Sequence, residues 1–246
     1  MCKPIIEKLQ NYSLALFVEL CRLPKEHGKL CWMELHSYLE ELLTRLATLV
    51  IAVKSGTLHT KNMLQSTGSL WEQCDAFKNL PKDNKATFLK KLSVICTLVS
   101  DALQELTEAA EDSGLSDCNE EQLSESQKRI VGPVIAITKA VKASLEKTRV
   151  LAEKPEAAQS DFSLDDIHVA VSAFSNHADD LAASFYDFES YQRIIEEAEK
   201  LEKECLHLYQ LLEADQSKLS EEDRKRISFL THVFQHNISK LKSIDQ

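Results

Sequence analysis

The stretch that decides the fold is residues 83–109, which read DNKATFLKKLSVICTLVSDALQELTEA. Asp83 precedes the run as an expected N-cap, because its carboxylate can accept from the free amides of a first helical turn. Apolar residues then recur at alternating spacings of four and three, the pattern of one helix face that packs on other helices at a shallow angle. These residues are Phe88, Leu92, Ile95, Val99, Ala102, Leu106 and Ala109.

Similar stripes lie on both sides of this stretch. No segment alternates with period two, and five Gly plus five Pro among 246 residues are too few for turn-rich β folds. The sequence therefore predicts an all-α fold, an antiparallel helical bundle in two halves. Helices are expected near residues 4–20, 35–53, 70–80, 83–109, 121–154, 163–185, 194–212 and 220–241, with a loop over 56–69 and a kink or fresh start at Gly132–Pro133.

The polar stretch Ser113–Asn119 is the expected boundary between the halves. It lies inside a run, 101–125, that holds nine acidic residues and no basic one. The predicted organisation is an N-terminal helical half-bundle over 1–112, an acidic connector over 113–119 and a C-terminal helical bundle over 120–246.

The net charge limits the classes of binding partner that are expected, and the cysteine pattern indicates the cellular compartment. With 29 basic and 39 acidic residues, the net charge of −10 opposes binding to DNA or to an anionic membrane. The best basic clusters are 139–149 and Arg224–Lys225–Arg226, and acidic residues directly precede the second. Seven scattered cysteines without a C-x-x-C pair indicate a reducing compartment, the cytoplasm and nucleus. No direct DNA or membrane partner is expected.

Two arrangements could have held metal ions. Glu204-x-x-His207 and Asp165-x-x-His168 match part of a carboxylate-bridged di-metal motif, but helical geometry turns them away from the apolar stripes. His232 and His236 have the spacing of H-E-x-x-H without its Glu. Asp179–Asp180 is interpreted as a solvated acidic pair. We therefore expect no metal, no cofactor, no catalytic residues and no enzyme, although a Cys/His dyad stays open.

Four residues are candidates for partner binding. Trp71 precedes a Pro-containing loop and could anchor a partner, although a plug at the end of the bundle is the favoured interpretation. If a helical seam is partly exposed, the first candidates are Leu201, Leu208 and Leu212, flanked by the pairs Glu196–Lys200 and Glu199–Lys203.

Several of these segments carry a family resemblance. They are LPKEHG (23–28), SLWEQC (69–74), LPKDNKA (80–86), KAVKASLEKTR (139–149) and LDDI (164–167). They resemble the GCIP-like family of cyclin-D-interacting proteins, over about residues 5–215. The resemblance implies a two-part bundle distantly like those of vinculin and catenin. Family members usually begin with a further helix that this sequence does not show, so an N-terminally shortened form is expected.

The resemblance also implies a function. It suggests a non-enzymatic regulator in cytoplasm and nucleus that binds D-type cyclins and helix-loop-helix transcription factors. Because no basic block precedes any seam, such a protein would sequester its partners without binding DNA itself. We expect negative regulation of the cell cycle and of transcription by occupancy. The alternative is an adaptor bundle of the cytoskeleton or of cell adhesion.

Overall fold

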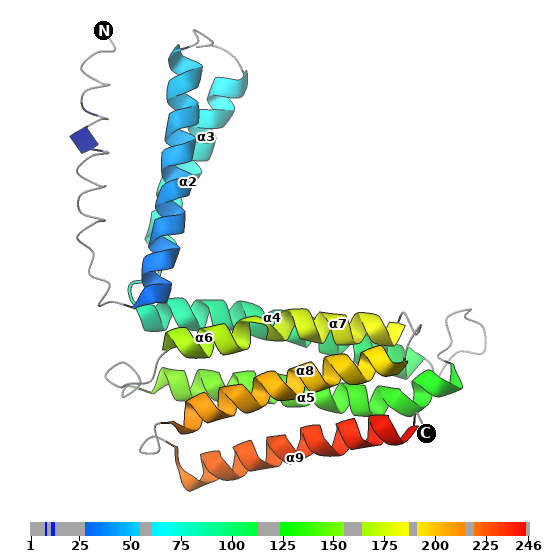
Figure 1. Cartoon of the computed structure of the whole chain (residues 1–246). Helices are drawn as coiled ribbons and strands as arrows, with labels where there is room; N and C mark the ends of the chain where they lie inside the picture. Colours follow the sequence, from blue (N-terminus) through cyan, green and yellow to red (C-terminus); the bar gives the residue numbers. More distant parts are fainter. Residues whose placement is uncertain are drawn as a thin grey trace. The chain divides into compact units, whose positions relative to one another are not determined.

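The structure is a computed structural model that describes residues 8, 11–12, 28–54, 61–112, 124–154, 164–186, 191–214 and 219–244. Every regular element in this part is helical, which confirms the all-α class (Figure 1). The α-helices are α2 (Lys29–Lys54), α3 (Lys61–Ala76), α4 (Asn84–Asp112), α5 (Glu125–Glu153), α6 (Leu164–Ser172), α7 (Phe174–Tyr186), α8 (Tyr191–Glu213) and α9 (Glu221–Ile244), with a 3-10 turn η2 (Phe77–Asn79).

The chain forms two compact units, Met1–Thr87 and Phe88–Gln246. This boundary precedes the apolar stripe of α4, whereas the boundary expected from the sequence, residues 113–119, follows that helix. The stripe explains the difference, because Phe88, Leu92, Val99 and Leu106 are fully buried and belong to the core of the second unit. The expected connector 113–119 lies outside the described residues, as does most of the expected helix over 4–20.

The first unit contains the α2–α3 hairpin, which begins at a glycine with a left-handed backbone. Gly28 has φ of 95°, and its carbonyl accepts the first helical hydrogen bond of α2 from Trp32 N at 3.2 Å. The Asn84 side chain closes the same turn by accepting from Cys31 N at 3.0 Å. Asp83 caps α4 as expected, accepting from Ala86 N at 2.7 Å.

The second unit is built around α8. This helix contacts α5, α6, α7 and α9, and α5 also contacts α7 and α9. A capping box between Ser124 and Gln127 starts α5, which then runs through Pro133 without a fresh start. Ser220 and Asp223 form a capping box at the start of α9, with N···O distances of 3.0 and 3.1 Å.

Two expected boundaries are wrong. The predicted loop over 56–69 is helical from Lys61 onward, because α3 extends from Lys61 to Ala76. The single helix expected over 163–185 is two helices, α6 and α7, separated at Ala173. Ile167, Val171 and Phe174 remain buried across this break, so the apolar stripe continues while the backbone does not. Among the described helices, none combines the length and the apolarity needed to cross a bilayer.

Candidate protein-interaction surface

A reciprocal pair of hydrogen bonds joins the two helices of the hairpin. The Tyr38 hydroxyl of α2 donates to the Gln73 carbonyl of α3 at 2.7 Å, and Gln73 Nε2 donates to the Tyr38 carbonyl at 3.3 Å. The Tyr38 ring also lies 5.9 Å from the Phe77 ring. Burial, followed by interaction with Cys74, raises the pKa of Tyr38, so its hydroxyl remains a donor at neutral pH.

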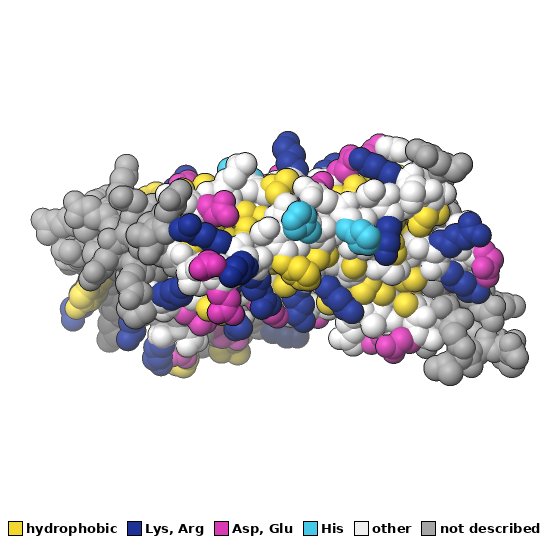
Figure 2. Space-filling view, turned by 90° about the horizontal axis from the view of Figure 1, so that it is seen from below, with side chains coloured by type: hydrophobic (Ala, Val, Ile, Leu, Met, Phe, Trp, Pro, Cys, Tyr) yellow, Lys and Arg dark blue, Asp and Glu magenta, His cyan; other side chains and the backbone are white. Residues whose placement is uncertain are grey.

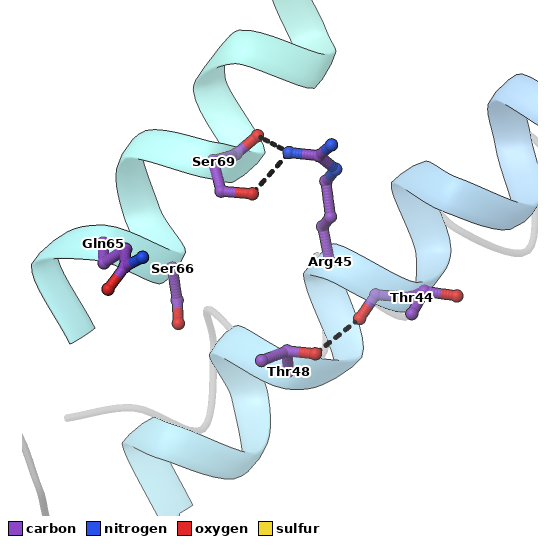
Figure 3. A pocket seen from close by; sticks show the side chains of 6 residues that line it. All are labelled: Thr44, Arg45, Thr48, Gln65, Ser66 and Ser69. Carbon is purple, nitrogen blue, oxygen red and sulfur yellow. Dashed lines mark hydrogen bonds between the residues drawn. The ribbon is translucent and has the colours of Figure 1, made fainter. Parts of the chain in front are cut away.

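Arg45 supplies a second joint between the same helices. Its Nη1 donates to the Ser69 carbonyl at 2.9 Å and also contacts Ser69 Oγ (Figure 3). Its Nε donates to Glu41 Oε1 at 3.2 Å, one turn earlier on α2. A guanidinium held on two sides in this way fixes the register of the two helices.

Beside Arg45 the hairpin surface has a hollow of about 360 Å³. Its six lining residues are Thr44, Arg45, Thr48, Gln65, Ser66 and Ser69 (Figure 3). None of these six side chains is a carboxylate or an imidazole, the groups that usually act as the general base and activate a serine or threonine hydroxyl. The lining offers hydrogen-bond donors and acceptors, which suits contact with a polar partner surface.

A line of exposed residues runs along α3 at spacings of four, three and four. We call Leu64, Gly68, Trp71 and Asp75 the α3 surface. Trp71 is 70% exposed and Leu64 is 76% exposed. Residues seven apart lie two turns from each other on the same side of a helix. Gly68 lies between them, and a Cβ built on it would meet no atom within 4 Å, so a notch separates the two large apolar side chains.

Exposed apolar side chains are concentrated in this unit. Of the sixteen large hydrophobic residues that are exposed in the described part of the chain, ten lie within Met1–Thr87. The first unit has little more than half the length of the second. The number of exposed large hydrophobic residues per unit length is therefore several times higher in the first unit. The face seen from below in Figure 2, nearest α9, instead has hydrophobic side chains scattered among basic, acidic and histidine side chains. Clustered apolar exposure typically marks a binding site.

This exposure corrects the favoured interpretation of Trp71. A tryptophan that plugged a bundle end would be largely covered, whereas most of this side chain faces solvent. The partner-anchor interpretation of Trp71 stays a prediction, because an exposed indole has the size and the polar N–H that interface anchors use.

The expected seam on α8 is not at the surface. Leu201, Leu208 and Leu212 are almost fully buried. The physical reason is that α8 contacts four other helices, so its apolar stripe is covered within its own unit. The flanking pairs also differ from expectation. Lys200 Nζ binds Glu197 Oε1 at 2.7 Å rather than Glu196, and Glu199 Oε1 binds Lys242 Nζ of α9 at 2.6 Å.

The structure does not bring the two sequence-predicted metal motifs together. His207, His232 and His236 are exposed, as expected from their helical positions. His168 is half-buried, and burial followed by the nearby Lys91 charge lowers its pKa, against a smaller opposite effect of Asp165. Neither motif appears among the groups of potential metal ligands in the described part of the chain.

Sequence reasoning missed a different constellation. His177 and Asp180 of α7 lie beside Glu197 of α8, with ligand atoms within 4.8 Å of one another. The signal present in the sequence is the i, i+3 spacing of His177 and Asp180. Glu197 could not be identified in the same way, because only the packing of α7 on α8 brings it to them.

Comparison with known proteins shows which family the chain is similar to. Residues 1–112 match the family model described as Grap2 and cyclin-D-interacting, N-terminal. A cyclin-D1-binding protein 1 homolog of Danio rerio is 29% identical over 265 residues, covering 99% of this chain and 76% of the relative. The homolog of Xenopus laevis is 28% identical, covering 98% and 78%. Cyclin-D1-binding protein 1 of Homo sapiens is 26% identical, covering 80% and 61%.

The family match spans the α2–α3 hairpin, the α3 surface and all of α4, so it extends beyond the first compact unit into the second. The relatives align over nearly the whole chain. On both grounds the chain is similar to the cyclin-D-interacting proteins of the GCIP-like family.

Proposed function

We propose that this chain is a non-enzymatic protein-binding module that binds a D-type cyclin through the α3 surface. The observation that carries the proposal is the exposure of Trp71 and Leu64 on a hairpin whose geometry is fixed by the bonds of Tyr38 and Arg45. The family match includes this hairpin, and the names of the relatives state cyclin-D1 binding. A rigid exposed tryptophan loses little conformational entropy on binding, which favours its use as an anchor.

The test measures the affinity of the full chain for a purified D-type cyclin. We expect Trp71→Ala to weaken binding by about 30-fold, the loss typical of an interface anchor of about 2 kcal/mol. Leu64→Ala should weaken it less, because leucine presents a smaller area. Phe229→Ala is the matched control, since Phe229 is an aromatic residue of α9 that is 64% exposed. Unchanged cyclin affinity in both α3-surface variants, or an equal loss in Phe229→Ala, would refute this surface.

The wider proposal is negative regulation of the cell cycle and of transcription by occupancy. In this view the chain binds D-type cyclins and helix-loop-helix factors in cytoplasm and nucleus without contacting DNA. The pairing of its basic residues supports the last point. Lys225 binds Glu221 at 2.7 Å, and both Lys147 and Lys154 bind Asp223, so these cations are compensated locally and are less available to phosphates.

A binding screen with cyclin, helix-loop-helix and actin baits separates the rival functions. Recovery of the first two, with no shift of labelled duplex DNA by the chain alone, supports regulation by sequestration. Co-sedimentation with actin and no cyclin recovery would favour the adaptor alternative. The antiparallel two-part bundle, distantly like those of vinculin and catenin, is part of the same proposal.

A further inference from the structure

Three potential ligand atoms converge where α7 packs on α8. His177 and Asp180 are one turn apart on α7, and Glu197 comes from the neighbouring helix (Figure 1). His177 Nδ1 lies 3.4 Å from Glu197 Oε2. Metal sites in helical bundles are commonly built in this way, from i, i+3 pairs on one helix and a carboxylate on a facing helix.

Glu197 is the unusual member of this group. Its side chain is only 8% exposed, and its Oε2 has no hydrogen-bond partner. His177 Nδ1 is likewise buried and has no hydrogen-bond partner. Leaving a carboxylate oxygen buried and unsatisfied is costly, so such an atom calls for a cation or a donor at that position. The Glu197 oxygen and the His177 nitrogen face each other, so a single cation between them could satisfy both.

Lys200 satisfies only part of this need. Its Nζ binds Glu197 Oε1 at 2.7 Å, which leaves Oε2 for another ligand. The Lys200 side chain is about half exposed, so it can also turn outward without being trapped. One lysine does not neutralise both Glu197 and Asp180.

The distance fits a tetrahedral metal ion. Bonds of about 2.0–2.2 Å at the tetrahedral angle place neighbouring ligand atoms about 3.4 Å apart, and His177 Nδ1 and Glu197 Oε2 are separated by that amount. Asp180 is exposed, and its carboxylate already lies within 4.8 Å of the other two ligand atoms. A ligand set of one imidazole and two carboxylates favours Zn²⁺ over Mg²⁺ or Ca²⁺, which prefer oxygen ligands alone.

We propose that His177 Nδ1, Asp180 and Glu197 Oε2 bind one Zn²⁺ ion between α7 and α8. This assigns a second ligand class to the chain, independent of the α3 surface, which lies in the other compact unit. It departs from the sequence interpretation, in which Asp180 belonged to a solvated acidic pair and no metal was expected. The ion would cross-link two adjacent helices and leave a fourth position for water or another ligand.

The experiment titrates Zn²⁺ into the full chain under reducing conditions and follows heat, stoichiometry and thermal stability. We expect one tight equivalent and a rise in melting temperature on Zn²⁺ addition. Glu197→Gln keeps the side-chain shape, and His177→Ala removes the nitrogen ligand. Each should weaken binding by about tenfold or more and abolish the Zn²⁺-induced rise. Circular dichroism of the metal-free variants establishes that they are folded.

The critical control is the double variant His232→Ala/His236→Ala. These histidines are exposed one turn apart on α9 and could bind Zn²⁺ without any built site. The double variant should keep the tight equivalent. If instead it loses the tight equivalent while Glu197→Gln and His177→Ala retain it, or if the native chain binds no Zn²⁺, the proposal is wrong. Substituting Co²⁺ checks the geometry, because its visible spectrum distinguishes tetrahedral nitrogen and oxygen ligands from cysteine sulfur.

Discussion

Lys147 of α5 contacts the carboxylate of Asp223 of α9, although 76 positions separate the two residues. The same carboxylate accepts from Ser220 N at 3.0 Å and lies 3.5 Å from Lys154 Nζ. One buried acid therefore both caps α9 and joins it to α5. Because Lys147 is itself mostly buried, neither charge can be removed without leaving the other poorly solvated.

Asp223→Asn should destabilise the chain by about 3–5 kcal/mol, the cost of leaving a buried charge without its partner. Chemical denaturation measured by circular dichroism gives this difference. Glu221→Gln is the control, since Glu221 pairs with Lys225 at an exposed position and should cost less than about 1 kcal/mol. Equal losses in the two variants would contradict a stabilising role for the buried ion pair between Asp223 and Lys147.

Acidification should weaken the ion pair between Asp223 and Lys147. Burial alone would raise the pKa of Asp223, but hydrogen bonds from Lys147 and Ser220 and the Lys147 charge hold that pKa well below its usual 3.8. A carboxyl with a depressed folded-state pKa contributes stability above its unfolded-state pKa and loses it as the pH falls. The advantage of the native chain over Asp223→Asn should therefore shrink progressively below about pH 5.

The native chain must be compared with Asp223→Asn at each pH, because other acidic residues change the stability of the fold with pH in the opposite direction. Burial, followed by Glu199, raises the pKa of Glu202, and a raised folded-state pKa favours the folded chain as pH falls. Denaturation curves of both proteins across this pH range isolate the contribution of Asp223. A difference that stays constant with pH would contradict the assignment.

Gly28→Ala should destabilise the hairpin by about 1–3 kcal/mol. The left-handed φ of Gly28 disfavours an alanine, and the added Cβ would overlap the Asn84 side chain that accepts from Cys31 N. Gly68→Ala is the matched control in the same unit. It lies in an exposed helix with open space around it, and should stabilise the hairpin by up to about 1 kcal/mol. Hydrogen exchange of α2 and α3 amides measures both changes.

Cysteine reactivity should follow burial. Cys74 is exposed on α3, whereas Cys205 is fully buried in α8 and burial raises the pKa of its thiol far above the usual range. Brief alkylation of the native chain, read by mass spectrometry, should label Cys74 and spare Cys205 until the chain unfolds. Early labelling of Cys205 would indicate that the core of the second unit opens readily.

The sequence predicted the parts of the fold that depend on periodicity. The stripe from Phe88 to Leu106 is buried as expected, and the expected cap at Asp83 forms. The break at Ala173 was not predictable, because the buried stripe continues through it with unchanged spacing. The early start of α3 was missed because Ser, Thr and Gly in 65–69 favour a loop by local propensity, yet packing on α2 keeps the segment helical.

The candidate site was harder to predict than the fold. A stripe of leucines looks the same whether a partner or the chain itself covers it, so Leu201 and Leu208 could not be assigned to the core from spacing alone. The exposure of Trp71 depends on which helices surround α3, which is tertiary information. The group at His177 required a residue from a second helix, and sequence spacing carries no signal for that.

The placement of the two indoles has a spectroscopic consequence. Trp32 and Trp71 are the only tryptophans of the chain, and both lie within Met1–Thr87. Intrinsic fluorescence therefore reports on the hairpin, while far-ultraviolet dichroism is dominated by the longer C-terminal part. Recording both signals during one denaturation experiment follows the unfolding of each unit separately, without any label. Coincident midpoints would indicate that the two units unfold in one cooperative transition.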